Sequence, residues 1–307
     1  MLNRRDIVRL TAVGGGAVFL SGLRGFAVAA DGARSALSDY GDFYFVQLSD
    51  THWGYSGAAN PDAANTLKKA VATVNALENQ PDFIIFTGDL THTTDDPTER
   101  RKRLAEFREI TSALKVRNIR FIPGEHDASL DNGAAYKEFF GQTHYAFNHK
   151  GVHFVTLDNV SDPGAMIGDA QLEWLKTDLA KQDKDAPIVV FTHRPLFDLA
   201  PKWDWATRDG AKAIELLMPY RNLTVFYGHI HQENHHQTGH IAHHSAKSLI
   251  FPLPAPGSQD KRTPLPWDAA MPNKGLGFRE GGAEVKEAQY QNRQLAVTKA
   301  QRCDTRE

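Results

Sequence analysis

Acidic and histidine side chains follow five apolar runs of this sequence, each at the point where the run ends. There are eight of them: Asp50, His52, Asp89, Glu125, His126, His193, His229 and His231. Carboxylates and imidazoles are the side chains that hold metals such as zinc, manganese and iron. One Asp-x-His or His-x-His pair is weak evidence, since most such pairs lie in turns or on surfaces. Five groups in series predict a metal site. The chain has one cysteine, Cys303, which excludes a site built from several thiolates.

The apolar runs have the length and composition of buried strands, and helical patterns alternate with them. Strands are predicted at 43–48, 83–86, 119–122, 187–191 and 223–227, a hairpin at 145–147 and 152–157, and helices at 61–79, 98–116 and 169–181. This alternation predicts an α/β domain with much parallel pairing, and the hairpin makes a mixed sheet the expectation. Sites in open α/β sheets lie at the carboxyl ends of strands, so the five groups are expected to meet.

The five blocks resemble the signature of the calcineurin-like metallophosphoesterase superfamily. They are Ser49-Asp50-Thr51-His52, Thr87-Gly88-Asp89-Leu90, Gly124-Glu125-His126-Asp127, Thr192-His193-Arg194-Pro195 and Gly228-His229-Ile230-His231. The blocks occur in the family's order and lie within roughly residues 43 to 250. The resemblance implies a four-layer α/β/β/α sandwich with mixed central sheets. It also implies two metal ions bridged by Asp89.

The resemblance further implies which side chains complete each ion's ligands. Asp50, His52 and His231 complete one ion, and Glu125, His193 and His229 complete the other. His126 is implied to contact the phosphate and to assist proton transfer. Two cations lower the pKa of a water between them and neutralise phosphoryl charge. We therefore expect hydrolysis of a small-molecule phosphate ester by a metal-activated hydroxide, with ions of the Fe, Mn or Zn type.

Glu125 departs from the family pattern, which usually has asparagine there. Glutamate adds a negative charge and removes an amide donor. With two divalent ions, three carboxylates then leave one net positive charge instead of two. A unit charge at about 4 Å is worth roughly 4 kcal/mol at an effective dielectric of 20, before screening by the metals. The expected consequence is either one trivalent iron or a preference for phosphodiesters over dianionic monoesters. The alternative is a periplasmic metal-binding protein with little or no catalytic activity.

Other features leave more than one interpretation open. Arg194 either contacts phosphate or is solvated, and Trp203 and Trp205 either stack on a base or sugar or anchor a loop. The histidines from 235 to 244 form either an auxiliary metal site or a polar hairpin, and the hairpin is favoured. The remaining histidines are expected to be surface residues or hydrogen-bonded ones: His92, His144, His149 and His153. No tyrosine follows Asp89 within three residues, which disfavours the tyrosine-ligated purple phosphatases and favours the cyclic-nucleotide phosphodiesterase branch.

The N-terminus predicts export. Residues 1–30 contain Arg4-Arg5, a Gly-rich apolar stretch and Ala27-Val28-Ala29-Ala30, the pattern of a twin-arginine signal with a cleavage site. We expect a linker at 31–42, the phosphoesterase domain at 43–300 and a polar tail at 301–307. The twin-arginine machinery would deliver the protein to the periplasm or beyond, with no stable membrane insertion after cleavage. A formal net charge of −2 argues against a nucleic-acid partner.

Overall fold

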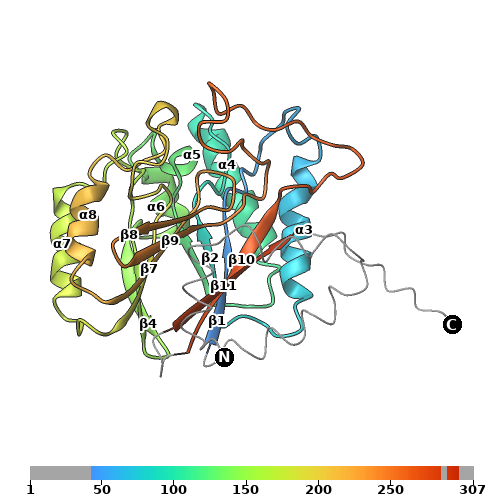
Figure 1. Cartoon of the computed structure of the whole chain (residues 1–307). Coiled ribbons are helices and arrows are strands. Elements are labelled where there is room, and N and C mark those ends of the chain that lie inside the picture. Colours follow the sequence, from blue (N-terminus) through green and yellow to red (C-terminus); the bar gives the residue numbers. More distant parts are fainter. Residues whose placement is uncertain (1–42, 285–288, 297–307) are drawn as a thin grey trace.

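Two mixed β-sheets pack face to face, with helices on the outer face of each (Figure 1). The computed structural model describes residues 43–284 and 289–296, so the predicted export signal (1–30), linker (31–42) and tail (301–307) lie outside the described residues, as do the last residues of the predicted domain. The arrangement is the four-layer α/β/β/α sandwich, and this prediction is confirmed.

The first sheet carries helices α3 (Ala63–Asn75) and α4 (Pro97–Thr111) on its outer face. Its strands are, in spatial order, β11 (Gln289–Ala296), β10 (Gly277–Glu284), β1 (Phe43–Leu48), β2 (Phe83–Thr87) and β3 (Ile119–Ile122). Strands β1, β2 and β3 are parallel, whereas β10 runs antiparallel to both of its neighbours. The carboxyl ends of β1, β2 and β3 therefore lie at one edge.

The second sheet carries helices α7 (Asp169–Leu179) and α8 (Gly210–Leu217) on its outer face. Its strands are, in spatial order, β4 (Tyr145–His149), β5 (Val152–Thr156), β6 (Pro187–Phe191), β7 (Asn222–Tyr227), β9 (Ile241–Ser245) and β8 (His235–Thr238). The four strands β5, β6, β7 and β9 are parallel, and β4 and β8 are antiparallel edge strands. Three short elements lie in the connections: α5 (Glu125–Ala128), α6 (Ala134–Phe140) and the 3-10 turn η2 (Pro201–Trp203).

The alternation of side chains along β1 explains the layers. Tyr44 and Val46 pack with the residues of α3 and α4, whereas Phe45 points between the sheets. The ring of Phe45 meets Phe191 and Phe226 of the second sheet edge-on, each at 5.4 Å between centroids. A strand with apolar side chains on both faces needs a layer on each side, and this one has helices on one and a sheet on the other.

Each predicted strand matches an observed one to within two residues at either end, and the larger differences lie at helix ends. The predicted helix at 61–79 begins later, because the Asn60 side chain bonds Ile250 O and Thr66 Oγ1 at 2.7 and 3.0 Å and holds the preceding turn. It ends at Asn75, whose side chain binds the backbone of Ala113 and Lys115 just beyond α4. Helix α4 is also shorter than the predicted helix at 98–116. No helix in 43–284 or 289–296 has the length and apolarity needed to cross a membrane.

Candidate metal centre

The eight singled-out residues meet at the edge where the parallel strands end. Within the described residues, three groups each have donor atoms within 4.8 Å of one another, and one of them consists of His52, His92 and His126. The other two contain seven of the eight residues: Asp50, His52, Asp89 and His231 in the first group, and Asp89, Glu125, His193 and His229 in the second. Their members are the same as the two ligand sets that the resemblance implies, with Asp89 in both. The geometry can hold two ions, while their binding stays a prediction.

The backbone of these loops is held in an unusual conformation. Five of the nine non-glycine residues with positive φ in the described structure belong to the two groups: Asp50 at 54°, His52 at 43°, Asp89 at 49°, His229 at 68° and His231 at 53°. Such a conformation costs about 1–3 kcal/mol per residue and persists where surrounding contacts enforce it. Here the loops after β1 and β2 are tied together, since Asp50 N donates to Gly88 O at 3.1 Å and His52 N to Asp89 O at 2.9 Å.

Two glycines of the motifs are required by close approach. A Cβ on Gly124 would lie 2.1 Å from both the backbone nitrogen and Oδ1 of Asp89. A Cβ on Gly228 would lie 2.0 Å from Ser49 Oγ and 2.9 Å from Asp50 Oδ2. Atoms this close to backbone and carboxylate cannot be accommodated, so any side chain at either position would push the loops apart.

Backbone amides orient the carboxylates. Asp50 accepts from His229 N at 3.1 Å through both oxygens, and Asp89 Oδ1 accepts from His126 N at 3.0 Å. Asp127 does the same for the neighbouring turns, since it accepts from the backbone of Leu90, Thr91 and Gly124 at 2.8–2.9 Å. The loops after β2 and β3 are thereby locked to each other.

Two histidines have their protons placed by main-chain carbonyls. His193 Nδ1 lies 2.7 Å from Thr87 O, and His231 Nδ1 lies 2.8 Å from Phe251 O. A carbonyl can only accept, so each Nδ1 carries a proton, and Nε2 is the nitrogen left to face the cluster and ligate a cation. This is the arrangement that metal-binding histidines need.

Glu125 lies between the two histidines of the second group. Its Oε1 is 2.8 Å from His229 Nδ1 and its Oε2 is 2.8 Å from His193 Nε2. Despite these short distances the atoms are not aligned for hydrogen bonds, and Glu125 Oε2, His193 Nε2 and both His229 nitrogens are buried without a hydrogen-bond partner. Buried polar atoms that converge without bonding one another fit ligation of a cation. The residues present therefore fit the implied metal pair.

Burial and mutual charge displace the pKa values of the centre in the absence of metal. Burial raises the pKa of Asp50 to about 8. Burial lowers the pKa of His193, but Asp89 and Glu125 outweigh it and hold that pKa well above the usual value. Burial raises the pKa of Glu125, yet His229 and His193 outweigh it and hold that pKa well below the usual value. At neutral pH and without metal, Asp50 in the first group and His193 in the second therefore each keep a proton that a bound cation would displace.

His126 is the most exposed of the eight residues, followed by Glu125. Its side chain is 28% exposed, and its Nε2 lies 4.0 Å from Asp89 Oδ2. Its Nδ1 accepts from Thr93 N at 3.2 Å and lies 2.6 Å from Thr93 Oγ1. A backbone amide can only donate, so the neutral ring carries its proton on Nε2. A proton donor is thereby presented near the Asp89 carboxylate.

Residues 43–233 match the family model described as calcineurin-like phosphoesterase. The chain belongs to this family. It is therefore a hydrolase that acts on phosphoric ester bonds. The family predicted from the five sequence blocks is confirmed.

Similar proteins include both diesterases and phosphatases by name. A probable cyclic nucleotide phosphodiesterase of Rhodopseudomonas palustris is 27% identical over 244 residues, which cover 70% of this chain and 84% of that protein. A serine/threonine-protein phosphatase of Mus musculus is 28% identical over 179 residues, covering 51% of this chain and 57% of that protein. A solved dimetal phosphatase from Danio rerio has a TM-score of 0.57 at 14% identity, covering 83% of this chain and 96% of that one, and shares the fold.

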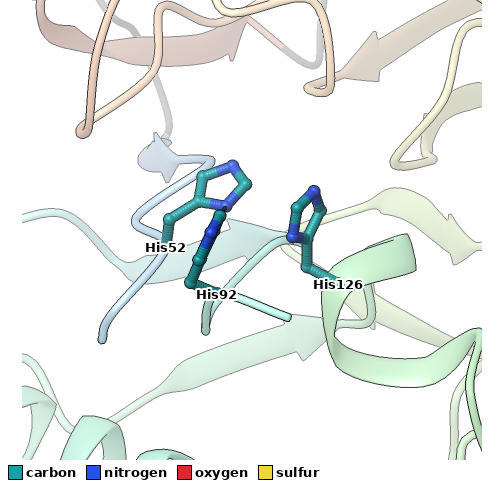
Figure 2. Close-up of side chains that lie close together, drawn as sticks. All are labelled: His52, His92 and His126. Atoms are coloured by element: carbon teal, nitrogen blue, oxygen red, sulfur yellow. Dashed lines mark hydrogen bonds between the residues drawn. The ribbon is translucent and has the colours of Figure 1, made fainter. Parts of the chain in front are cut away.

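His92 of this phosphoesterase lies in the centre, although no motif pointed to it. Its Nδ1 is 3.3 Å from His52 Nδ1, and Figure 2 shows its ring beside those of His52 and His126. The sequence analysis expected a surface or hydrogen-bonded histidine and did not place it in the centre. The available signal was its place three residues after Asp89, in a loop that leaves β2 at the same edge.

Arg194 and the two tryptophans are used for packing. Arg194 is 4% exposed, and its guanidinium donates to Ala206 O at 2.8 Å and pairs with the Asp204 carboxylate at 2.8 Å. It is not a solvated arginine, since its Nε and Nη2 donate to residues of the loop. Trp203 and Trp205 are 5% and 0% exposed and meet edge-on at 4.8 Å. They anchor the loop and offer no open face for stacking.

The histidines from 235 to 244 form the β8–β9 hairpin, as the favoured interpretation has it. His235 Nδ1 lies 2.6 Å from His244 Nδ1, and His235 Nε2 lies 3.1 Å from Glu233 Oε1. The metal-holding groups found within the described ranges include none of these residues. The other unassigned histidines have local contacts: His144 with Trp174, His149 with Asp82 and His153 with Asp178.

Proposed function

We propose that this phosphoesterase hydrolyses phosphodiesters in preference to monoesters, with two ions of the Fe, Mn or Zn type. Asp89 is proposed to bridge the ions. The remaining ligands are Asp50, His52 and His231 for one ion and Glu125, His193 and His229 for the other. His126 is the proposed catalytic residue that contacts substrate.

The position of Glu125 is the observation that carries the preference for diesters. Its carboxylate lies 2.8 Å from the ring nitrogens of both His193 and His229, at the place where the family usually has a neutral amide. The side chain is 21% exposed, and we infer that a bound substrate feels its charge as the ligands do. A dianionic monoester loses more by this added charge than a monoanionic diester does. The relative named as a phosphodiesterase, with 84% of its length matched, supports the same choice.

The ions, when bound, would supply a hydroxide nucleophile and neutralise charge on the phosphoryl oxygens. The protein's own part is positioning and proton transfer. Thr93 holds Nδ1 of His126 through its amide, which leaves the Nε2 proton free to pass to the leaving oxygen of the ester. Asp127 fixes the loops that carry Asp89 and His126.

The test uses purified protein whose metal content is measured on the same sample. Bis-p-nitrophenyl phosphate and p-nitrophenyl phosphate are compared by kcat/KM. We expect two metal ions and the higher kcat/KM for the diester. Two divalent ions together with a preference for the monoester would contradict the proposal. A trivalent iron would restore the missing positive charge. Monoester turnover by an iron-containing protein would therefore mean that the metal, and not the choice of substrate, compensates for the charge of Glu125. Tight metal binding without turnover of any phosphate ester would support the alternative, a metal-binding protein.

We also propose export through the twin-arginine machinery to the periplasm or beyond. The support is the sequence of residues 1–30, in particular Arg4-Arg5. Fractionation of cells that express the full chain should find the wild type outside the cytoplasm and the Arg4→Lys, Arg5→Lys double variant inside it. Equal distribution of the two would contradict the proposal.

A further inference from the structure

His92 is in contact with the first metal group through one atom pair. Its Nδ1 lies 3.3 Å from Nδ1 of His52, which is hydrogen-bond distance. Its ring also stacks on that of His126 at 5.1 Å between centroids, with an angle of 25° between the planes. The three rings gather at the same place in Figure 2, although His92 comes from the loop after β2 and His52 from the loop after β1.

The proton of His52 decides what this contact does. Nε2 of His52 faces the first group, at 3.5 Å from Asp89 Oδ2 and 3.2 Å from His231 Nε2. A neutral imidazole that offers its Nε2 lone pair to a cation carries the proton on Nδ1. That N–H is a buried donor, since His52 is 2% exposed, and it needs an acceptor. Nδ1 of His92 is the atom found in reach of it.

His92 is itself firmly placed. Its backbone nitrogen donates to Trp53 O at 2.9 Å, and its carbonyl accepts from Arg103 Nη1 at 2.8 Å. The ring of Tyr55 meets its ring edge-on at 5.1 Å between centroids. Because both its backbone and its ring are held in place, the His92 side chain can present Nδ1 as an acceptor in a fixed direction.

Two other histidines of the two groups, His193 and His231, have their Nδ1 atoms held by main-chain carbonyls. His52 has a side chain in the equivalent place. We propose that His92 is a positioning residue for the first metal ion: it accepts the Nδ1 proton of His52 and so fixes the tautomer and ring orientation that His52 needs as a ligand. The inference rests on the proposed metal centre and adds to it a residue outside the two groups.

The same three histidines could instead hold a third ion, because their donor atoms also lie within 4.8 Å of one another. Two observations on the ring protons disfavour a third ion. Nδ1 of His126 already accepts from Thr93 N. His52 would have to lose both ring protons to ligate one ion through Nε2 and another through Nδ1. The positioning role needs neither change.

Two substitutions separate the acceptor from the ring. His92→Phe keeps an aromatic ring and removes the acceptor, whereas His92→Asn removes the ring and places an amide oxygen close to the position of Nδ1. His144→Phe is the matched control, since His144 also meets an aromatic ring edge-on, that of Trp174, but lies outside the centre. The full chain is freed of metal with a chelator and titrated with zinc by calorimetry.

We expect the wild type and His144→Phe to bind two zinc ions with the same affinities. His92→Phe should weaken one of the two by about 10–100-fold, the range found when the hydrogen-bond partner of a metal-binding histidine is removed. His92→Asn should restore most of that loss. Unchanged affinities in a folded His92→Phe protein would overturn the inference while leaving the metal centre intact. Failure of the wild type to bind zinc, and manganese or iron in the same titration, would instead refute the centre itself.

A measurement on the wild type avoids any dependence on the folding of a variant. In zinc-loaded protein with ¹⁵N-labelled histidine, we expect His52 to show a protonated Nδ1 and a zinc-bound Nε2. His92 should show an unprotonated Nδ1 and a protonated Nε2. A protonated Nδ1 on His92 would overturn the inference, and so would a zinc-bound one together with a third bound ion.

Discussion

The two metal groups share Asp89 and have the same formal charge, but their other carboxylates are placed differently. Asp50 of the first group is 0% exposed and bonds the backbone of His229. Glu125 of the second group is 21% exposed and lies 2.8 Å from two imidazoles without bonding to them. The first carboxylate is therefore part of the scaffold, while the second can act on both the ion and the substrate. We therefore expect Glu125, rather than Asp50, to influence the preference between substrates.

Substitution of Asp89, the carboxylate that both groups share, has the largest expected effect, because it removes a ligand from both groups at once. Asp89→Asn removes the proposed bridge and one negative charge from both sites. We expect activity to fall by about a thousandfold or more, which is ~4 kcal/mol of transition-state stabilisation. Measured metal content should drop for both ions together. Retention of one full equivalent of metal would show that the groups do not depend on a common ligand.

His126 belongs to neither group, so its removal should leave both filled. His126→Asn deletes the Nε2 proton donor, and we expect kcat to fall by about 10²–10⁴-fold, the usual contribution of a general acid or base. Metal content should stay at the wild-type level. A parallel loss of metal would place His126 among the ligands and contradict its proposed role.

The strands and their terminal motifs were predictable, because buried strands and the turns after them are local patterns. The meeting of Asp50, Asp89 and His229 followed from the parallel order of the strands. The proton placement on His193 and His231 was not predictable, since it depends on carbonyls distant in the sequence.

The position of His92 and the packing role of Arg194 escaped prediction for the same reason. Each depends on which partner the fold brings near: His52 in the first case, and Asp204 and Ala206 in the second. A single sequence does not show which partner the fold brings near, although the place of His92 three residues after Asp89 indicated that it lies at this edge of the sheet. Helix ends were also missed, because Asn75 binds a loop that follows another helix.

Metal loading should release protons from both groups. At neutral pH the raised pKa values of Asp50 and His193 keep one proton in each group when metal is absent. A cation must displace it, so affinity should weaken as pH falls, by about tenfold per pH unit for each ion. Calorimetry in buffers of different ionisation enthalpy should find about one proton released per ion at pH 7. Zinc affinities that do not change between pH 6 and 7 would contradict the proton assignment.

The most direct test of the account is the ratio of diester to monoester kcat/KM in Glu125→Asn, measured on protein of known metal content. The substitution removes the charge that distinguishes the second group and restores the family's usual amide. After allowance for partial exposure and screening, we expect the ratio to move toward the monoester by about tenfold, or ~1.4 kcal/mol. Glu109→Gln, on the exposed surface of α4, is the control for loss of one negative charge and should leave the ratio unchanged. A Glu125→Asn protein with two ions and an unchanged ratio would contradict the central claim.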